Sequence, residues 1–206
     1  MPVIAIVNPK GGVGKSTVAT NLAGFFASSH PTMLGDLDAQ QTSRDWLAQR
    51  PASAAPIEAW EMKGGAVRPP KGVTHVVIDT PAQMPIDRLT SVMRGVDKML
   101  VPVQPSMFDI RATAGFLRAM RSAFNDDRRF ARSVGIVGVR VDPRTRSAEE
   151  LSRFVTAMGL PVAGYLRDTQ AYVHLAAHGL TVFDVRAGQV AQDLETWQPL
   201  TQWVLH

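Results

Sequence analysis

Residues 3–17, VIAIVNPKGGVGKST, decide the fold of this chain. An apolar run ends in a glycine-rich turn, and Lys15, Ser16 and Thr17 then open a helical pattern. This order of strand, glycine-rich loop and helix is typical of a loop that binds nucleotide phosphates. Glycines let backbone N–H groups approach phosphate oxygens, because no Cβ stands in the way, and the helix adds the positive end of its dipole.

Within this motif, Lys15 is expected to reach the β- and γ-phosphates of a nucleotide, and the Ser16 hydroxyl to bind Mg²⁺. The general pattern G-x-x-x-x-G-K-[ST] has glycine at the position of Pro9, and this chain carries an additional lysine, Lys10, before its glycine pair. A lysine beside the glycines lacks the geometry to duplicate Lys15 on the same nucleotide. Two interpretations of Lys10 remain open, a solvated loop residue and a role across an interface between two chains.

With its signature Lys-Gly-Gly-x-Gly-Lys-Ser-Thr, the chain resembles the deviant Walker A ATPases of the ParA/MinD superfamily, and among them the small ParA-type (ParF-like) proteins. In that family the additional lysine crosses a dimer interface to the phosphates of the partner's ATP. The resemblance implies that Lys10 does so here, that ATP and Mg²⁺ are the cofactors, and that bound ATP forms a homodimer. The implied phosphate-binding set is Lys10, Gly11, Gly12, Val13, Gly14, Lys15, Ser16 and Thr17, with both lysines catalytic.

Apolar, β-rich runs alternate with helical patterns along the rest of the chain. We expect strands at 3–7, 32–37, 57–60, 73–79, 97–103, 134–141 and 161–164, and helices at 15–29, 42–49, 85–94, 110–124, 147–158 and 190–204. The segment 50–72, rich in Pro, Ala and Gly, is the least defined. The predicted fold class is α/β, a P-loop domain over residues 1–206 with a doubly wound, mainly parallel sheet flanked by helices and ligands at the carboxyl ends of its strands.

Carboxylates lie at the ends of two of the expected strands: Asp36 and Asp38 at the end of the second strand, and Asp79 at the end of 73–79. An isolated aspartate at such a place can simply cap the next turn or helix. Next to a phosphate loop, however, Mg²⁺ needs carboxylates from a neighbouring strand, so Asp79 is expected to reach the metal directly or through water. Asp36-Leu37-Asp38-Ala39-Gln40 also resembles the family's Asp-x-Asp-Pro-Gln segment. The resemblance implies that Asp38 activates the attacking water and contributes to the Mg²⁺ site directly or through water, and that Asp36 supports the site by hydrogen bonding.

Residues 101–109, VPVQPSMFD, end a strand and open a helix. Prolines can simply stop a strand, and Asp109 can be the N-cap of a helix that begins at residue 110. The stretch also resembles the proline-rich segment of small ParA proteins, which implies that Pro105 and Asp109 lie close to the nucleotide and the dimer interface.

The composition, 45% hydrophobic and 19% charged residues in a chain of 206, is that of an ordinary globular protein. The absence of cysteine excludes disulfides, thiolate metal sites and iron–sulfur ligation, and suits a cytoplasmic protein. The sequence contains no apolar run of 18 residues, so no transmembrane helix is predicted. The N-terminus has no secretory leader pattern.

Positive charge is concentrated between residues 111 and 146, which hold nine arginines against three acidic residues. Single arginines are common on solvated helix faces, but a dimer doubles a cluster, and each neutralised phosphate adds salt-dependent affinity for nucleic acid. We therefore expect non-specific binding to the DNA backbone and association with the nucleoid. The candidate residues are Arg128, Arg129, Arg132 and Arg167.

The resemblance implies a slow, Mg²⁺-dependent ATPase that partitions or positions a plasmid, a chromosome region or a large cytosolic cargo. A ParB-like or cargo-adaptor protein would stimulate its hydrolysis. One alternative is a MinD-like membrane-associated regulator, but residues 189–206 lack Lys and Arg. The apolar stripe there is therefore interpreted as core packing and no membrane contact is expected; its residues are Leu194, Trp197, Leu200 and Val204.

A second alternative is a metabolic P-loop enzyme, which would need a substrate pocket with its own polar cluster. His75, His174 and His178 are the candidates for such a cluster. The spacing of the last two predicts that they share one helix face, where they could form a pair of metal ligands without a third.

Overall fold

The computed structural model describes residues 2–61 and 72–206. Within them, seven strands form one sheet in the order β3-β2-β4-β1-β5-β6-β7, and every pairing is parallel. The predicted α/β class with a mainly parallel sheet is thus confirmed. The strands are β1 (Val3–Ile6), β2 (Thr32–Asp36), β3 (Ile57–Trp60), β4 (His75–Asp79), β5 (Lys98–Val103), β6 (Val134–Val139) and β7 (Val162–Leu166).

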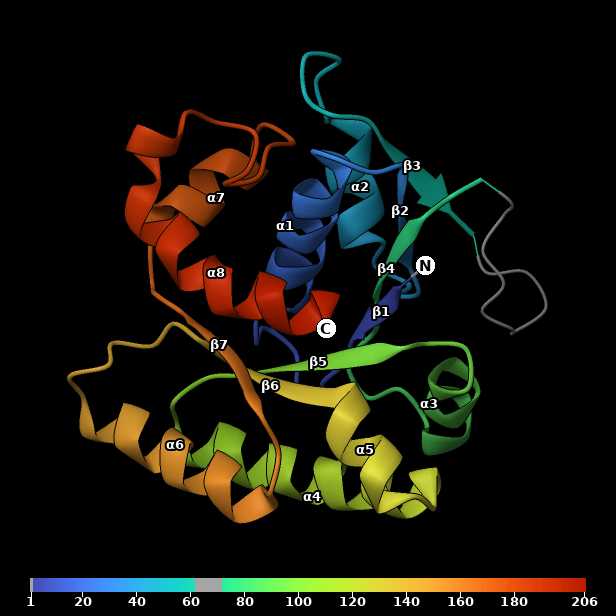
Figure 1. Cartoon of the computed structure of the whole chain (residues 1–206), viewed down its shortest axis with the longest axis vertical. Coiled ribbons are helices and arrows are strands. Elements are labelled where there is room, and N and C mark those ends of the chain that lie inside the picture. The colour runs from blue at the N-terminus through green and yellow to red at the C-terminus, as the bar shows by residue number, and fades with distance from the viewer. Residues whose placement is uncertain (1, 62–71) are drawn as a thin grey trace.

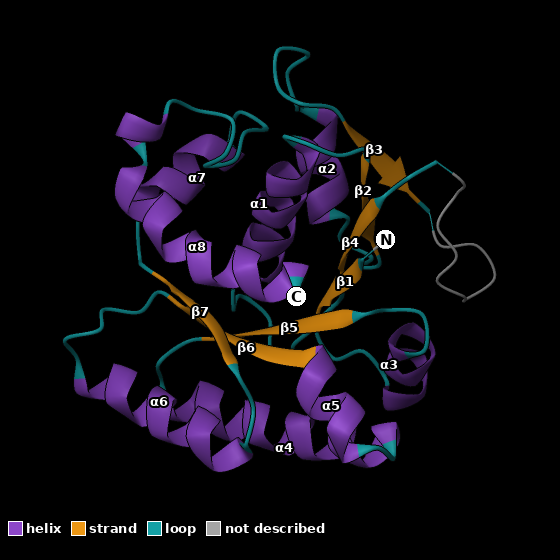
Figure 2. Ribbon diagram, viewed as in Figure 1, coloured by secondary structure: helices purple, strands orange, loops and turns teal. Residues whose placement is uncertain are grey.

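Helices cover both faces of the sheet (Figures 1 and 2). One layer contains α1 (Lys15–Ala27), α2 (Thr42–Ala48), α7 (Gln170–Ala176) and α8 (Ala191–Leu205). The other contains α3 (Ile86–Met93), α4 (Met107–Phe124), α5 (Asp127–Ser133) and α6 (Arg146–Met158), and a 3₁₀ turn, η1 (Ala187–Gln189), precedes α8. This double layer explains why the strands are apolar on both faces.

The central strand β1 divides its side chains between two cores. Val3 and Ala5 pack on the layer of α3 to α6, whereas Ile4 and Ile6 pack on the layer of α1 and α8. The register pairs Ile6 with Asp79 and Asp79 with Asp36. The carboxylates of two neighbouring strands are therefore brought to the edge of the sheet where β1 enters its glycine-rich loop.

The expected elements are present with their ends shifted by a few residues, and the strand expected at 57–60 is β3. Residues 62–71 of the poorly defined segment lie outside the described part of the chain. Two short helices of seven residues each, α5 and α7, were not among the expected elements. Their signals are N-caps: the side chain of Asp126 accepts a hydrogen bond from the amide of Arg129, and that of Thr169 from the amide of Ala171.

Two local expectations were wrong. Helix α4 begins at Met107 rather than 110, and its N-cap is Ser106, whose hydroxyl accepts a hydrogen bond from the amide of Asp109. Asp109 is thus the third residue of the helix, where its amide and its carboxylate both contact the Ser106 hydroxyl, and it is not the N-cap. Helix α7 ends at Ala176, so His178 lies beyond it and its Nδ1 is 2.8 Å from the carbonyl oxygen of His174. The two histidines do not share a helix face.

The apolar stripe of α8 is buried. Trp197 and Leu200 are completely inaccessible, and Val204 is nearly so, in the core that α8 shares with α1 and the sheet. The interpretation of this stripe as core packing is confirmed. None of the helices in residues 2–61 and 72–206 is both long and apolar enough to span a bilayer.

Candidate nucleotide site

The glycine-rich loop joins β1 to α1 in a conformation that its glycines permit. Gly12 and Gly14 have φ angles of 74° and 86°, in the left-handed region where a side chain would be strained. Gly14 is the N-cap residue of α1, and its carbonyl accepts the first helical bond from the amide of Val18. The amino end of α1 therefore faces the loop, as the sequence predicts.

Two amide side chains that sequence reasoning missed hold this loop in place. Asn8 is buried, donates from Nδ2 to the carbonyl of Pro102 (2.8 Å), and accepts at Oδ1 from the amide of Lys10 (2.8 Å). Gln104 donates from Nε2 to the carbonyl of Gly12 (3.0 Å). An Asn or Gln after a strand carries no specific signal in the sequence. Only the pairing of β1 with β5, which brings the two segments together, shows that Asn8 and Gln104 anchor the glycine-rich loop.

The two lysines of the loop occupy different environments. Lys15 is buried, its Nζ donates to the carbonyl of Lys10 (2.9 Å), and burial lowers its pKa although the charges of Asp79 and Asp38 raise it. The side chain of Lys10 is 44% exposed, and its ammonium forms an ion pair with the carboxylate of Asp109. Only Lys15 therefore lies within the phosphate cradle of its own chain.

Asp79 has the environment of a metal-binding carboxylate. Its side chain is buried, and Oδ2 accepts a hydrogen bond from the hydroxyl of Ser43 (2.6 Å). Burial raises its pKa to about 6, against the hydrogen bond from Ser43 and the influence of the nearby Ser16 hydroxyl, while the charge of Asp36 raises it further. Among the residues that the structure describes, no donor satisfies Oδ1. A buried carboxylate oxygen without a donor, beside the Ser16 hydroxyl, fits a hard cation such as Mg²⁺.

Asp36 organises the loop that carries Asp38. Its Oδ1 accepts from the amide of Asp38 (2.9 Å), and its Oδ2 accepts from the amides of Ser43 (2.8 Å) and Arg44 (3.2 Å) at the start of α2. Asp38 is half-buried and accepts from the amide of Gln40 (3.0 Å). The expected supporting role of Asp36 thus has a concrete form, which is to cap α2 and to hold the backbone of Asp38.

The segment after β5 reaches the same loop. Asp109 is buried, receives a hydrogen bond from the hydroxyl of Ser106, and contacts Lys10. Pro105 is half-buried and follows Gln104, which anchors the loop. The structure therefore places Asp109 against the additional lysine, and Pro105 one residue from a loop contact.

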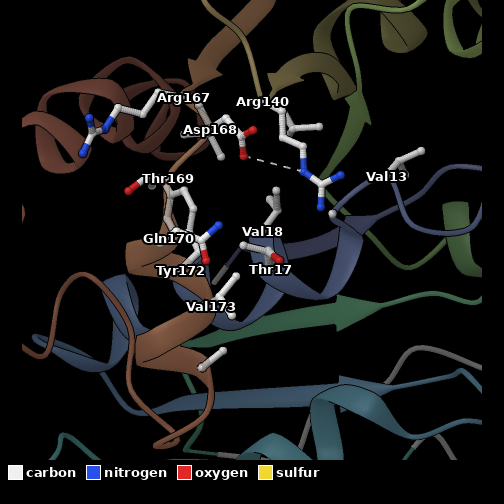
Figure 3. A pocket seen from close by; sticks show the side chains of 14 residues that line it. Val13, Thr17, Val18, Arg140, Arg167, Asp168, Thr169, Gln170, Tyr172 and Val173 are labelled. Carbon is white, nitrogen blue, oxygen red and sulfur yellow. Dashed lines mark ion pairs between the residues drawn. The ribbon is translucent and has the colours of Figure 1, made fainter.

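A pocket of about 500 Å³ continues from the loop along α1 (Figure 3). Arg140 and Asp168 approach each other at 3.9 Å between Nε and Oδ1, and Arg140 has a φ of 55°. Sequence reasoning missed this pocket, because its walls come from the ends of β6 and β7 and from α7. The lining residues are Val13, Gly14, Thr17, Val18, Val139, Arg140, Leu166, Arg167, Asp168, Thr169, Gln170, Tyr172, Val173 and Ala176.

The remaining candidate residues lie outside the loop, although Arg167 lines the pocket that continues from it. Arg128, Arg129 and Arg132 are exposed on α5. Arg167 instead uses its guanidinium within the chain, where Nε lies 2.6 Å from Oδ1 of the buried Asp193. His75 begins β4 at the opposite edge of the sheet and stacks between Phe26 and His30. Across the described ranges, no cluster of three or more His, Cys, Asp or Glu side chains is arranged to hold a metal.

Comparison with known proteins agrees with a nucleotide site at the glycine-rich loop. The model of the CobQ/CobB/MinD/ParA nucleotide binding domain matches residues 4–182. Maintenance of carboxysome distribution protein A from Gloeobacter kilaueensis is 30% identical over 200 residues, which cover 94% of this chain and 88% of that protein.

Two solved structures share the fold at low sequence identity. A Borrelia burgdorferi B31 protein described as a plasmid partition protein, bound to AMPPNP, is 13% identical with a TM-score of 0.75, over 99% of this chain and 98% of that one. The MinD cell division protein of Aquifex aeolicus is 14% identical with a TM-score of 0.74, over 99% and 95%. From the family match and the arrangement of its glycine-rich loop, we conclude that this chain belongs to the CobQ/CobB/MinD/ParA nucleotide-binding family.

Proposed function

We propose that this chain is an ATPase that binds ATP and Mg²⁺, forms a homodimer through Lys10, and then binds DNA without sequence preference. In this state it positions a plasmid, a chromosome region or a large cytosolic cargo on the nucleoid, in the cytoplasm. A ParB-like or cargo-adaptor protein stimulates ATP hydrolysis and thereby releases the ATPase from the DNA. The carboxysome distribution protein of G. kilaueensis, at 30% identity, supports a cargo of the large cytosolic kind.

The observation that carries this proposal is the separation of the two lysines. Lys15 is buried within the glycine-rich loop, whereas Lys10 is half-exposed and forms an ion pair with Asp109. A solvated loop lysine would have no fixed partner, whereas Lys10 is held by Asp109 with its side chain 44% exposed, so it could reach the nucleotide of a second subunit. This arrangement favours a role across an interface.

Each residue of the cradle has a task in the proposed reaction. Backbone amides of Gly11 to Lys15 and the Lys15 ammonium bind and orient the phosphates. Ser16 and the free oxygen of Asp79 are the groups that would hold Mg²⁺, which neutralises phosphate charge when bound. Asp38 would accept a proton from the attacking water, and its carboxylate is kept near Lys15 by the amide contact to Asp36.

The pocket along α1 is the proposed place of the nucleoside. It shares Val13, Gly14 and Thr17 with the loop, so it continues from the position expected for the phosphates. Its volume of about 500 Å³ lies within the range of small-molecule sites. A purine ring would pack on Val139 and Leu166, and Arg140 and Asp168 offer polar contacts at its edge.

Replacing Val173 with aspartate is expected to weaken ATP binding about tenfold, or ~1.4 kcal/mol. Val173 lines the pocket with 60% of its surface exposed, so the substitution should barely affect folding but would set a carboxylate against the purine ring proposed to bind there. Calorimetric titration with ATP measures the effect. Leu205→Asp, at a similarly exposed residue on α8, is the control and should bind like the unaltered chain; equal affinities for both variants would contradict this placement.

Gel-shift titration with random-sequence DNA tests the complete proposal. We expect binding with Mg·ATP, none with ADP or without nucleotide, and a steep decrease in affinity as salt rises, because phosphate contacts release counterions. Lys10→Ala should retain ATP in the monomer but lose ATP-dependent dimerisation, measured by sedimentation, and with it DNA binding. A Lys10→Ala chain that still dimerises with ATP and hydrolyses it normally would contradict the role given to Lys10.

The arginines of α5 can be tested in the same titration. Arg128 and Arg132 are four residues apart and exposed, so the double alanine variant should weaken DNA binding uniformly across sequences and reduce the salt slope. Arg153→Ala, on α6 in an exposed pair with Glu149, is the matched control. Arg167 is a weaker candidate because Asp193 already holds its guanidinium.

Two other outcomes would favour the alternatives. ATP-dependent sedimentation with anionic vesicles, without DNA binding, would favour a MinD-like regulator, although the apolar stripe of α8 is buried. Turnover of a small carboxylate substrate that is independent of DNA would favour a metabolic enzyme of the same fold.

A further inference from the structure

A serine outside the predicted set connects the two carboxylate-bearing strands. Ser43 lies in the first turn of α2 and is completely buried. Its hydroxyl donates to Oδ2 of Asp79 (2.6 Å), and its amide donates to Oδ2 of Asp36 (2.8 Å). One residue therefore contacts both the candidate metal ligand at the end of β4 and the carboxylate that holds the loop of Asp38.

The hydroxyl contact fixes how Asp79 faces the site. The two oxygens of a carboxylate are equivalent until a neighbour distinguishes them. Ser43 occupies Oδ2, and within the described part of the chain Oδ1 keeps no donor. The oxygen left free is the one available to a cation. Without the hydroxyl, the carboxylate could rotate about its Cβ–Cγ bond, and the metal would bind a mixture of orientations.

The backbone contact connects this orientation to the loop that precedes α2. Asp36 receives the amides of Asp38 and Ser43 on its two oxygens. The position of Asp38 and the position of the Ser43 hydroxyl are therefore set by the same carboxylate. A shift of α2 would move the Ser43 hydroxyl away from Asp79 and, at the same time, release the backbone of Asp38.

We propose that Ser43 is a positioning residue, which holds Asp79 in the orientation that binds Mg²⁺ and joins the metal site to the loop of Asp38. The inference rests on the proposed use of Mg·ATP, and it assigns to this chain a contact that neither the glycine-rich motif nor the Asp-x-Asp segment contains. Removing a group that orients a metal ligand lowers metal affinity by roughly 10–100-fold.

The test compares Ser43→Ala, Ser43→Thr and Thr42→Ala by Mg²⁺ titration. The probe is ATP labelled on its ribose with N-methylanthraniloyl, whose fluorescence reports binding. For Ser43→Ala we expect the half-saturating Mg²⁺ concentration to rise about tenfold or more, with unchanged affinity for the probe in EDTA. Ser43→Thr keeps the hydroxyl and should restore most of the response. Thr42 is exposed in the same turn, so Thr42→Ala should match the unaltered chain.

Four results separate the possibilities. A Ser43→Ala chain with the same Mg²⁺ requirement as Thr42→Ala would overturn the inference. So would a loss of probe affinity that is as large in EDTA as in Mg²⁺, since that is the sign of a purely structural role. A chain that responds to Mg²⁺ but never binds DNA would overturn the proposed function alone, because this titration contains no DNA. Probe binding that is insensitive to Mg²⁺ in the unaltered chain would overturn both.

Discussion

Replacing Asp38 with alanine is expected to lower the rate of ATP hydrolysis by roughly 10²–10⁴-fold, the usual contribution of a general base, while ATP binding persists. The side chain is half-buried near Lys15, and its backbone is held by Asp36. Loss of the carboxylate should leave the phosphate contacts of the loop intact but remove the group proposed to orient and deprotonate water. Phosphate release and ATP affinity, measured on the same sample, separate the two effects.

The same variant should be trapped in its ATP state. If hydrolysis ends the DNA-bound dimer, Asp38→Ala must remain on DNA after the unaltered chain has dissociated. Asp45→Ala is the matched control, since Asp45 is an exposed carboxylate in the first turn of α2. Normal turnover in Asp38→Ala would show that another residue activates the water.

The largest effect on folding is expected from Arg50→Ala. The guanidinium of Arg50 and the carboxylate of Asp184 form a bidentate pair, with distances of 2.9 Å and 2.7 Å, and their side chains are only 5% and 4% exposed. Truncation leaves Asp184 charged and unpaired in the interior, which typically costs about 3–5 kcal/mol. That is a large part of the about 5–15 kcal/mol that stabilises most domains. Urea unfolding followed by tryptophan fluorescence measures the loss in the free energy of unfolding.

An exposed pair provides the control for this measurement. Arg153 contacts Glu149 at 3.3 Å with both side chains largely solvated, so Arg153→Ala should cost about 0–1 kcal/mol. Equal losses in the two variants would mean that burial does not decide the effect of Arg50.

The pH dependence of unfolding gives a second check on the buried pair. Burial raises the pKa of Asp184, but the hydrogen bonds from Arg50 and Thr181 outweigh it, and the pKa lies below the ordinary 3.8. A lowered pKa means that the folded chain holds this proton more weakly than the unfolded chain. The stabilisation is therefore complete at pH values above the ordinary pKa and is lost as the pH falls through the folded pKa. Arg50→Ala should remove that acid-labile part.

The glycine-rich motif and the alternation of apolar runs with helical patterns were sufficient to predict the fold class and the place of the glycine-rich loop between β1 and α1. The carboxylates at the ends of β2 and β4 were found for a physical reason, since parallel strands bring their carboxyl ends to one edge. The short helices α5 and α7 were missed, because a helix of two turns depends more on its cap and its packing than on periodicity.

Contacts between distant segments were not predictable from one sequence. Asn8 and Pro102 lie far apart along the chain, as do Arg50 and Asp184, and their pairing follows from strand order and helix placement. Ser43 carried no motif of its own, and only the register of β2 against β4 shows that its hydroxyl meets Asp79. The pocket along α1 was missed for the same reason, because its walls are assembled from three separate segments.

The contact between Lys10 and Asp109 has a consequence for the strength of the proposed dimer. To reach the nucleotide of a neighbouring subunit, Lys10 must first leave Asp109. The net free energy of dimerisation that it contributes is therefore the difference between its contact with the phosphates and its contact with Asp109. In the proposed dimer, each subunit would carry an internal competitor for its own interface, which would keep association weak enough to reverse. Once the γ-phosphate was lost, the balance would return to Asp109, which offers the lysine a carboxylate in its own chain.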